Sequence, residues 1–444
     1  MNTFFGLEIG KRALQTNQLS LDVTGQNISN ANTPGYSRQV ANDVATDPYA
    51  VPSAFAPVGA LQIGTGVTAE SITRIHTDYL DSQYRSSNAV MNYWQQRDSL
   101  FSSVQGVLNE PSANGLQNSM DQFFNSLQEL SKQPTDASVR SVVVEQAQTM
   151  GVQFGQLMNQ FETVGSNIGE QTTGAFSEIN SITSQIAGLD GQIANAQNTN
   201  MQPNDLLDKR DLLVDQLSNI ADVQVNNTGG TYTVTLAGQA VVNGNASTNI
   251  TSATPQTGSL KALQDMNVYV GQMEQNLNGL MTTVSTQVNT VHQKGYGLDG
   301  STGNTFFTTG ADSAGNVTLS VDPLLISNPT KIAAATSQGQ AGDGSNALAM
   351  ATLQHQTTMD SNSATFDQHY SAMIASIGVD ASGAHSELQT QQALTNQVND
   401  ARQSVSGVNL DEEASNMIKF QQSYAAAARF VTTLQTVMDT LLKM

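Results

Sequence analysis

The C-terminal stretch of the chain carries apolar side chains at steps of three and four residues. They are Met417, Phe420, Tyr424, Ala427, Val431, Leu434, Met438 and Leu441. Because an α-helix turns once in about 3.6 residues, this spacing places all of them on one helix face. Upstream, Asn409 is a favoured N-cap residue, and Glu412 follows three residues later, close to a capping box. A long helix with one narrow apolar stripe is typical of a coiled-coil seam, so this helix needs a partner.

A second helix with a weaker stripe is predicted near the N-terminus, over residues 3–30. Its heptad track consists of Leu7, Leu14, Leu21 and Ile28. We expect the helix to end before Pro34, Gly35 and Tyr36, because proline presets the second position of a type II turn and glycine supplies the positive φ of the third. The two terminal helices are interpreted as a coiled-coil assembly interface, with this turn leading the chain out of it. Periodicity alone leaves open the plainer alternative that both stripes are core helices of a soluble domain.

The interior is predicted to be mostly helical, with one change of period. Residues 75–220 read as helices, whereas Thr231–Leu236 alternates strictly and predicts a small β meander or hairpin. Helices are expected again after residue 258, at 345–377 and at 385–405, and residues 40–72 are interpreted as irregular. The predicted fold is mainly α with a small β insertion and an elongated helical-bundle body. The predicted segments are an N-terminal axial coiled-coil segment (1–39), two parts of the helical body (40–222 and 258–405), the β insertion (223–257) and a C-terminal axial coiled-coil helix (406–444).

Charge and cysteine content exclude several classes of function. The formal net charge is −20, so a basic surface for nucleic acid or anionic lipid is not expected. The chain has no cysteine, which excludes disulfides, zinc–thiolate sites and thiol catalysis. No apolar run of about 18 residues occurs, so membrane insertion is not predicted. The first residues lack the basic start and apolar core of a secretory signal, so we expect no cleaved signal peptide.

No catalytic, cofactor-binding or metal-binding residues are predicted. The five histidines, which are expected in surface or packed roles, are His76, His292, His355, His369 and His385. A P-loop and a nucleophile elbow are both absent from the sequence. The stretch 312–316 is loosely calcium-like, but its residue types are those of an ordinary turn. Residues 208–211, Asp-Lys-Arg-Asp, are interpreted as a solvated helix face.

Both ends of the sequence resemble one family. The stretch from Ala13 to Gln39, containing DVTGQNISNANTPGYSRQ, is similar to the N-terminal signature of bacterial flagellar axial proteins. The stretch from Ser406 to Arg429, SGVNLDEEA followed by FQQSYAAAAR, resembles the C-terminal signature, in the form found in the first hook-associated protein (FlgK) family. Residues 342–349, GDGSNALA, resemble an internal segment of that family. Together these matches identify the chain as a member.

The resemblance implies a structural role and no enzymatic activity. It implies an adaptor ring at the hook–filament junction that assembles through paired terminal helices and allows filament growth. The implied partners are other copies in a ring or helical layer, the hook protein below, a second junction protein above and a cytoplasmic export chaperone on the C-terminal helix. The implied location is extracellular, in the flagellum, after type III export without cleavage.

Two alternatives remain at this point. The chain could be a hook, rod or filament subunit, although its DEEA motif and long helical body disfavour hook and rod, and flagellin lacks the Thr-Pro-Gly-Tyr turn. A secreted enzyme on a flagellar scaffold would need a catalytic cluster in the β insertion, and residues 223–257 contain none.

Overall fold

The computed structural model describes residues 3–48, 63–108, 110, 112, 115–228, 230–311 and 316–443. Most of the loosely calcium-like stretch 312–316 therefore lies outside the described residues. The chain divides into two compact units. Unit 1 comprises Met1–Asn92, Phe176–Gly258 and Gln391–Met444, and unit 2 comprises Tyr93–Ala175 and Ser259–Thr390. Three long helices are divided between the units: α2 (Asp78–Leu108), α4 (Ala137–Asn198) and α9 (Phe366–Ser406).

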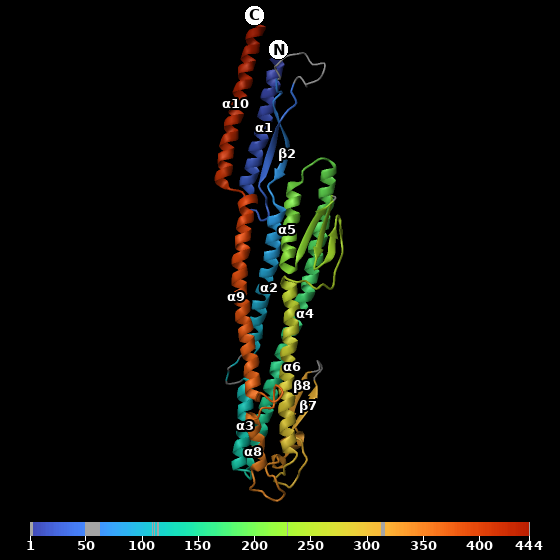
Figure 1. The fold of residues 1–444 in the computed structure, drawn as a ribbon, viewed down its shortest axis with the longest axis vertical. Coiled ribbons are helices and arrows are strands. Elements are labelled where there is room, and N and C mark those ends of the chain that lie inside the picture. The colour runs from blue at the N-terminus through green and yellow to red at the C-terminus, as the bar shows by residue number, and fades with distance from the viewer. Residues whose placement is uncertain are drawn as a thin grey trace. The chain divides into compact units, whose positions relative to one another are not determined.

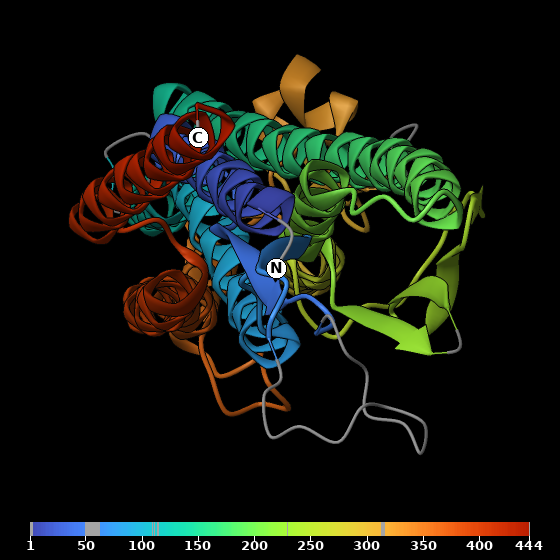
Figure 2. The same cartoon turned by 90° about the horizontal axis from the view of Figure 1, so that it is seen from above.

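The terminal helices of unit 1 pair as the sequence predicts. Helices α1 (Thr3–Asn30) and α10 (Leu410–Leu442) lie side by side in both views (Figures 1 and 2). A Cβ added to Gly6 would lie 2.9 Å from Leu434 Cδ1, and one added to Gly10 would lie 2.5 Å from Val431 Cγ2. As the residue number increases along α1, the number of the contacting residue on α10 decreases, so the two helices are antiparallel. The two glycines let the helix backbones approach closely.

The interpretation of residues 40–72 as irregular is wrong for 40–45 and 67–72, and residues 49–62 lie outside the described residues. Strands β1 (Gln39–Ala45) and β2 (Val67–Arg74) form an antiparallel hairpin with an irregularity between Asn42 and Asp43. The hairpin packs against α1, where a Cβ at Gly66 would lie 3.5 Å from the Ile9 Cα. The prolines and glycines that suggested an irregular segment all lie between the two strands in the sequence.

The predicted β meander is confirmed as a four-stranded sheet in the order β3-β4-β5-β6. Its strands are β3 (Val223–Thr228), β4 (Thr231–Leu236), β5 (Gln239–Asn243) and β6 (Ala246–Ser247). Alternate residues of β4 are buried, as period-two patterning requires. Asn180 of α4 holds the loop after the sheet, since its side chain both donates to and accepts from the Ile250 backbone, each at 2.9 Å. Helix α5 (Asn204–Ile220) completes unit 1.

Unit 2 is built around one apolar core. Helices α3 (Leu116–Lys132), α6 (Ser259–His292) and α8 (Ser345–Thr352) pack with the hairpin β7 (Phe307–Ala311) and β8 (Val317–Val321) and the short helix α7 (Pro323–Ser327). Two separate helices were predicted at 345–377 and 385–405, whereas the structure has α8 and one continuous α9. Clustered phenylalanines fill the core: Phe101, Phe123, Phe124, Phe154, Phe161, Phe306, Phe307 and Phe366.

The internal motif at 342–349 is architectural. Asp343 accepts hydrogen bonds from the backbone N–H groups of Thr336 and Ser345, at 2.8 and 2.9 Å. A Cβ at Gly344 would overlap the Ser131 carbonyl oxygen, so only glycine lets α8 begin against the end of α3. The Asn346 side chain donates to Ala333 O at 2.7 Å. The motif therefore joins α3, α8 and the preceding loop.

His292 is a buried, neutral structural residue at the end of α6. Its Nδ1 lies 2.8 Å from Asn304 O, and its Nε2 accepts the backbone N–H of Ala333 at 2.9 Å. Burial lowers the pKa of His292 to about 4. A proton on Nε2 would also remove the hydrogen bond from Ala333. His292 thus joins two loops of unit 2 only in its uncharged form.

We expect unit 2 to lose stability as the pH falls from about 6.5 to about 4. The unfolded histidine binds its proton near pH 6.5 and the folded one only near pH 4, so acid favours unfolding. The loss should approach about 1.4 kcal/mol per pH unit, or about 3 kcal/mol in total. Urea unfolding followed by the fluorescence of Trp94, the only tryptophan of the chain, measures it.

A matched pair of variants isolates this effect. Between pH 6.5 and 5, His292→Gln should remove most of the pH dependence, and the exposed His355→Gln should leave it unchanged. A wild-type stability that is flat over this range contradicts the prediction.

Candidate assembly site

The C-terminal stripe faces α1 but is only partly covered. Met417, Phe420, Val431, Leu434 and Met438 are half-buried. Tyr424 retains 38% of its exposure and Leu441 retains 56%. Within α10, all of which the structure describes, the buried residues are Glu413 and Ala427. The stripe therefore forms the seam with α1 and leaves much apolar surface open.

The N-terminal heptad track is not the most buried face of α1. Leu7, Leu14, Leu21 and Ile28 are all half-buried. The buried positions are Gly10, Thr16, Ser20, Val23, Thr24 and Asn27. Sequence reasoning missed this face because it did not foresee the β1–β2 hairpin, which covers another side of the helix. The role of all these residues in assembly stays a prediction.

The turn after α1 has the predicted type II geometry. Tyr36 N donates to Thr33 O at 3.2 Å, and Gly35 has a φ of +77°. Pro34 precedes Gly35 and is exposed. A Cβ at Gly35 would lie 3.1 Å from the Cβ of Leu212 on α5. Gly35 is thus required both by its φ and by the close approach of α5.

Gly35→Ala is expected to weaken the turn by about 1–2 kcal/mol, because alanine disfavours positive φ and its Cβ crowds Leu212. Gly25→Ala is the control. Gly25 lies inside α1 with no atom within 4 Å of an added Cβ, so alanine should stabilise the helix by about 0.5–1 kcal/mol. Hydrogen exchange of the Tyr36 amide, which is bonded within the turn, should accelerate in Gly35→Ala and should not accelerate in Gly25→Ala. Equal effects of the two changes would contradict the prediction.

The two signature sequences meet in one buried group, here called the terminal cluster (Asn27, Tyr36, Arg38, Gln39 and Glu413). Asn27 Nδ2 donates to Gln39 O at 2.9 Å and to Glu413 Oε2 at 3.0 Å. Asn27 Oδ1 accepts from Gln39 N at 3.0 Å and from Tyr36 Oη at 2.9 Å. Every hydrogen-bonding position of this amide is therefore used, and the residue is 1% exposed.

Glu413 provides the negative charge of the terminal cluster, opposite Arg38. It is 2% exposed and lies 2.7 Å from Arg38 Nε. The backbone N–H of Arg38 also donates to Ser406 O at 2.9 Å. Burial raises the pKa of Tyr36, and the carboxylates of Asp205, Asp208 and Glu413 raise it further. The phenol therefore stays protonated and can donate its hydrogen bond.

The cap of α10 is partly as predicted. Asn409 Oδ1 accepts from the backbone N–H groups of Asp411 at 3.0 Å and Glu412 at 3.3 Å, which confirms the N-cap. The Glu412 carboxylate instead accepts from Arg38 Nη2 at 3.0 Å. The cap is therefore joined to the N-terminal segment.

The interpretation of residues 208–211 as a solvated face is wrong. Asp208, Arg210 and Asp211 are buried, and Lys209 is exposed. Aspartates at steps of three and four form an acidic stripe on α5, here meaning Asp205, Asp208, Asp211 and Asp215. Arginines from distant segments neutralise it, which a local pattern of charges does not reveal. The helical spacing of the four acids was the available signal.

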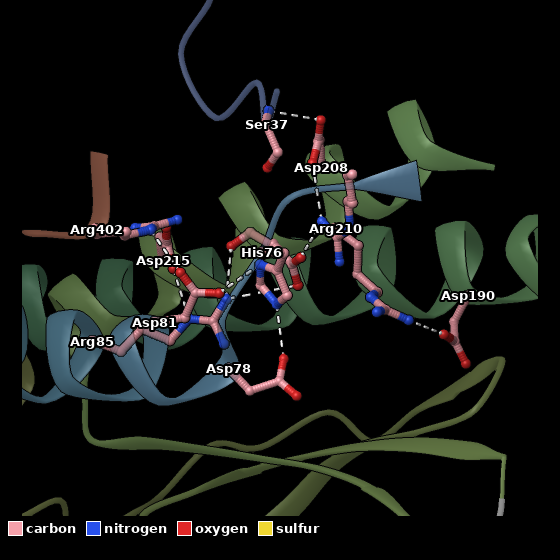
Figure 3. A network of polar contacts seen from close by, with 12 residues as sticks. Ser37, His76, Asp78, Asp81, Arg85, Asp190, Asp208, Arg210, Asp215 and Arg402 are labelled. Carbon is pink, nitrogen blue, oxygen red and sulfur yellow. Dashed lines mark hydrogen bonds and ion pairs between the residues drawn. The ribbon is translucent and has the colours of Figure 1, made fainter. Parts of the chain in front are cut away.

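Ion pairs join the stripe to β2, α2 and α9 (Figure 3). Arg74 Nη1 lies 3.0 Å from Asp208 Oδ1 and 2.6 Å from Asp211 Oδ2. Asp215 receives Arg85 Nε at 2.6 Å and Arg402 Nη1 at 2.7 Å. Burial alone would raise the pKa of Asp211, but Arg74, Arg85 and Arg210 hold it below its usual value.

A groove of about 970 Å³ lies between the two signature stretches at the ends of the chain. The turn at 33–36 forms one wall and residues 403–409 form another. Its lining is rich in side-chain amides and hydroxyls. Among the described residues, no group of three or more histidines and carboxylates could hold a metal ion. The described helices include none long and apolar enough to cross a membrane.

Comparisons with known proteins place the chain in a family. Residues 101–257 and 247–307 match the family described as "Flagellar hook-associated protein FlgK helical domain". Residues 7–36 match "Flagella basal body rod protein", and residues 401–444 match "Flagellar basal body rod FlgEFG protein C-terminal". Flagellar hook-associated protein 1 of Bacillus subtilis is 31% identical over 497 residues, covering 99% of this chain and 97% of the relative. The chain belongs to the flagellar hook-associated protein 1 family.

Further members of the family are more distant. Flagellar hook-associated protein 1 of Escherichia coli is 25% identical, with 97% of each chain covered. The solved structure of the flagellar hook junction protein FlgK from Burkholderia pseudomallei aligns with a TM-score of 0.63 at 20% identity. That alignment covers 73% of this chain and 100% of the other, and it supports the fold. In this member of the hook-associated protein 1 family, the two terminal matches, 7–36 and 401–444, contain most of the terminal cluster.

Proposed function

We propose that this chain is the structural adaptor at the hook–filament junction of a bacterial flagellum. The single observation that carries the proposal is its similarity, over nearly its whole length, to flagellar hook-associated protein 1 of Bacillus subtilis. In this role the chain forms a ring or helical layer, with the hook protein below and a second junction protein above. It acts mechanically and catalyses no reaction.

The open surface of α10 supports assembly through the terminal helices. Seven of its large apolar side chains are exposed: Leu410, Ile418, Tyr424, Phe430, Val437, Leu441 and Leu442. Burial of apolar side chains supplies most of the stability of a helix, so a helix that packs against a single partner on one side is only weakly stabilised. Exposed apolar surface of this kind marks an interaction site. Contact with terminal helices of neighbouring copies would cover it.

Threonines in the C-terminal half of α10 allow another helix to pack closely against it. Thr432 and Thr433 both donate to Arg429 O, and Thr436 and Thr440 each donate to the carbonyl four residues earlier. With the hydroxyl hydrogen bonded inside the helix, each side chain has no unpaired donor to bury. A neighbouring helix can therefore pack here without leaving a hydroxyl proton unsatisfied.

Export follows from the same surface. The parts of α1 and α10 beyond the terminal cluster, whose apolar side chains depend on neighbours, are expected to be unfolded in the free chain and to fold on assembly. An unfolded end can pass through the type III export channel without cleavage. A cytoplasmic chaperone on the C-terminal helix would keep its apolar stripe from aggregating before export.

Deletion of the gene, followed by electron microscopy, tests the proposal. Cells without the chain should carry hooks without filaments and release unpolymerised flagellin into the medium, and a plasmid copy should restore filaments. Normal filaments on the deletion strain would exclude the junction role.

A further inference from the structure

The acidic stripe of α5 contacts the segment that leads from α1 to β1. Ser37 N donates to Asp208 Oδ2 at 3.0 Å. Gln39 Nε2 donates to Asp205 Oδ1 at 3.1 Å. Figure 3 shows Ser37 beside Asp208, above the other charged residues. One face of α5 therefore contacts the chain directly after the turn.

The other strand of the hairpin reaches the same stripe. Arg74 is the last residue of β2 and lies opposite Gln39 in the β1–β2 register. Its guanidinium bridges Asp208 and Asp211. Both strands are thus attached to α5 at the end of the hairpin nearest α2. The acidic stripe therefore binds two segments: the one that follows α1 and the one that precedes α2.

These contacts fix the position of the turn segment on α5 more than they stabilise the fold. A hydrogen bond to an ionised group contributes about 1.5–3 kcal/mol, and a buried carboxylate must keep its partners or leave an uncompensated charge. Arg74 shares Asp211 with Arg85, and Asp215 binds both Arg85 and Arg402. A shift of the turn along α5 would break the contacts of Ser37, Gln39 and Arg74 together. One placement of the turn is therefore favoured.

We propose that the acidic stripe of α5 is a positioning element, which holds the turn at 33–36 and so sets the direction in which the α1–α10 pair leaves the rest of unit 1. This inference rests on the proposed function, because direction matters only where many copies must place their terminal helices alike. Asp208 is its central residue, since it binds both the backbone after the turn and Arg74.

Hydrogen exchange on the purified full-length chain tests the positioning directly. In Asp208→Ala the Ser37 amide loses its acceptor, and its exchange should accelerate about tenfold or more. Asp208→Asn keeps one acceptor oxygen for the Ser37 amide but turns its NH2 toward Arg74, so Ser37 exchange should accelerate less than in Asp208→Ala. Lys209→Ala changes the exposed neighbour and should have no effect. Amides of α6, in unit 2, should exchange at the wild-type rate in all three variants.

A second measurement connects position to assembly. In the deletion strain, Asp208→Ala should give few filaments, Asp208→Asn should give more than Asp208→Ala, and Lys209→Ala should restore them fully. The proposal is overturned if the Ser37 amide already exchanges freely in the wild-type chain, or if Asp208→Ala leaves its exchange unchanged. It is also overturned if Asp208→Ala exposes Ser37 and still restores filaments, if Asp208→Asn behaves like Asp208→Ala, or if α6 loses protection. A deletion strain that makes normal filaments refutes the proposed function instead, without affecting the exchange result.

Discussion

Leu434→Asp is expected to abolish incorporation of the chain at the hook–filament junction while unit 2 stays folded. Leu434 lies on the seam of α10, where its Cδ1 fills the space left by Gly6. Aspartate would lose that apolar contact and place a carboxylate between two helices, at a cost of about 3 kcal/mol for each copy. Because every copy in a layer carries the change, the loss is repeated around the assembly. We expect filament number to fall at least about tenfold.

Gln435→Asp is the matched control, since it adds the same charge at the next, exposed position of α10. It should restore filaments as wild type does. Trp94 fluorescence, which reports on unit 2, should be native in both variants. Normal junctions formed by Leu434→Asp would show that the α1–α10 seam is not needed for assembly.

The helices and strands were largely predictable where one face of the element packs against the protein and the apolar side chains repeat with its period. The stripe of α10 and the alternation of β4 each report a face that packs on one side, and both elements are confirmed. The β1–β2 hairpin was missed because its strands carry little apolar burial: Gln39 is buried, and the other positions are half-buried or exposed. The continuity of α9 was missed because its apolar pattern is weak, and its burial is set by tertiary packing.

The candidate site was predictable in its residues but not in its chemistry. The signature stretches were recognised as separate motifs, and the structure brings them together through Asn27, Arg38 and Glu413. No local pattern indicates that Arg38 will meet a residue nearly four hundred positions away. The stripe on α5 was misread for the same reason, because its arginine partners lie on other elements. Long-range pairing of charges is a property of topology, and one sequence does not reveal it.

Glu413→Gln should destabilise the terminal cluster by about 3 kcal/mol. The change keeps the shape of the side chain but leaves Arg38 without its buried partner and removes the charge from the hydrogen bond of Asn27. Breaking a buried ion pair from one side costs about 3–5 kcal/mol, and the remaining pair of Arg38 with Glu412 offsets part of this cost. The amides of Arg38 and Gln39 donate to Ser406 O and Asn27 Oδ1, so their hydrogen exchange gives the opening free energy.

Glu412→Gln provides the comparison, because both glutamates bind the same arginine and differ in burial. The Glu412 side chain is 55% exposed, and an exposed ion pair contributes at most about 1 kcal/mol. In a double-mutant cycle with Arg38→Gln, we expect a coupling energy of about 2–3 kcal/mol for Glu413 and less than about 1 kcal/mol for Glu412. Equal coupling for the two glutamates would mean that burial of the Arg38–Glu413 pair does not hold the chain ends together. The larger coupling at Glu413 would instead explain why the two signature stretches occur in one chain, since each supplies half of a buried ion pair that neither can satisfy alone.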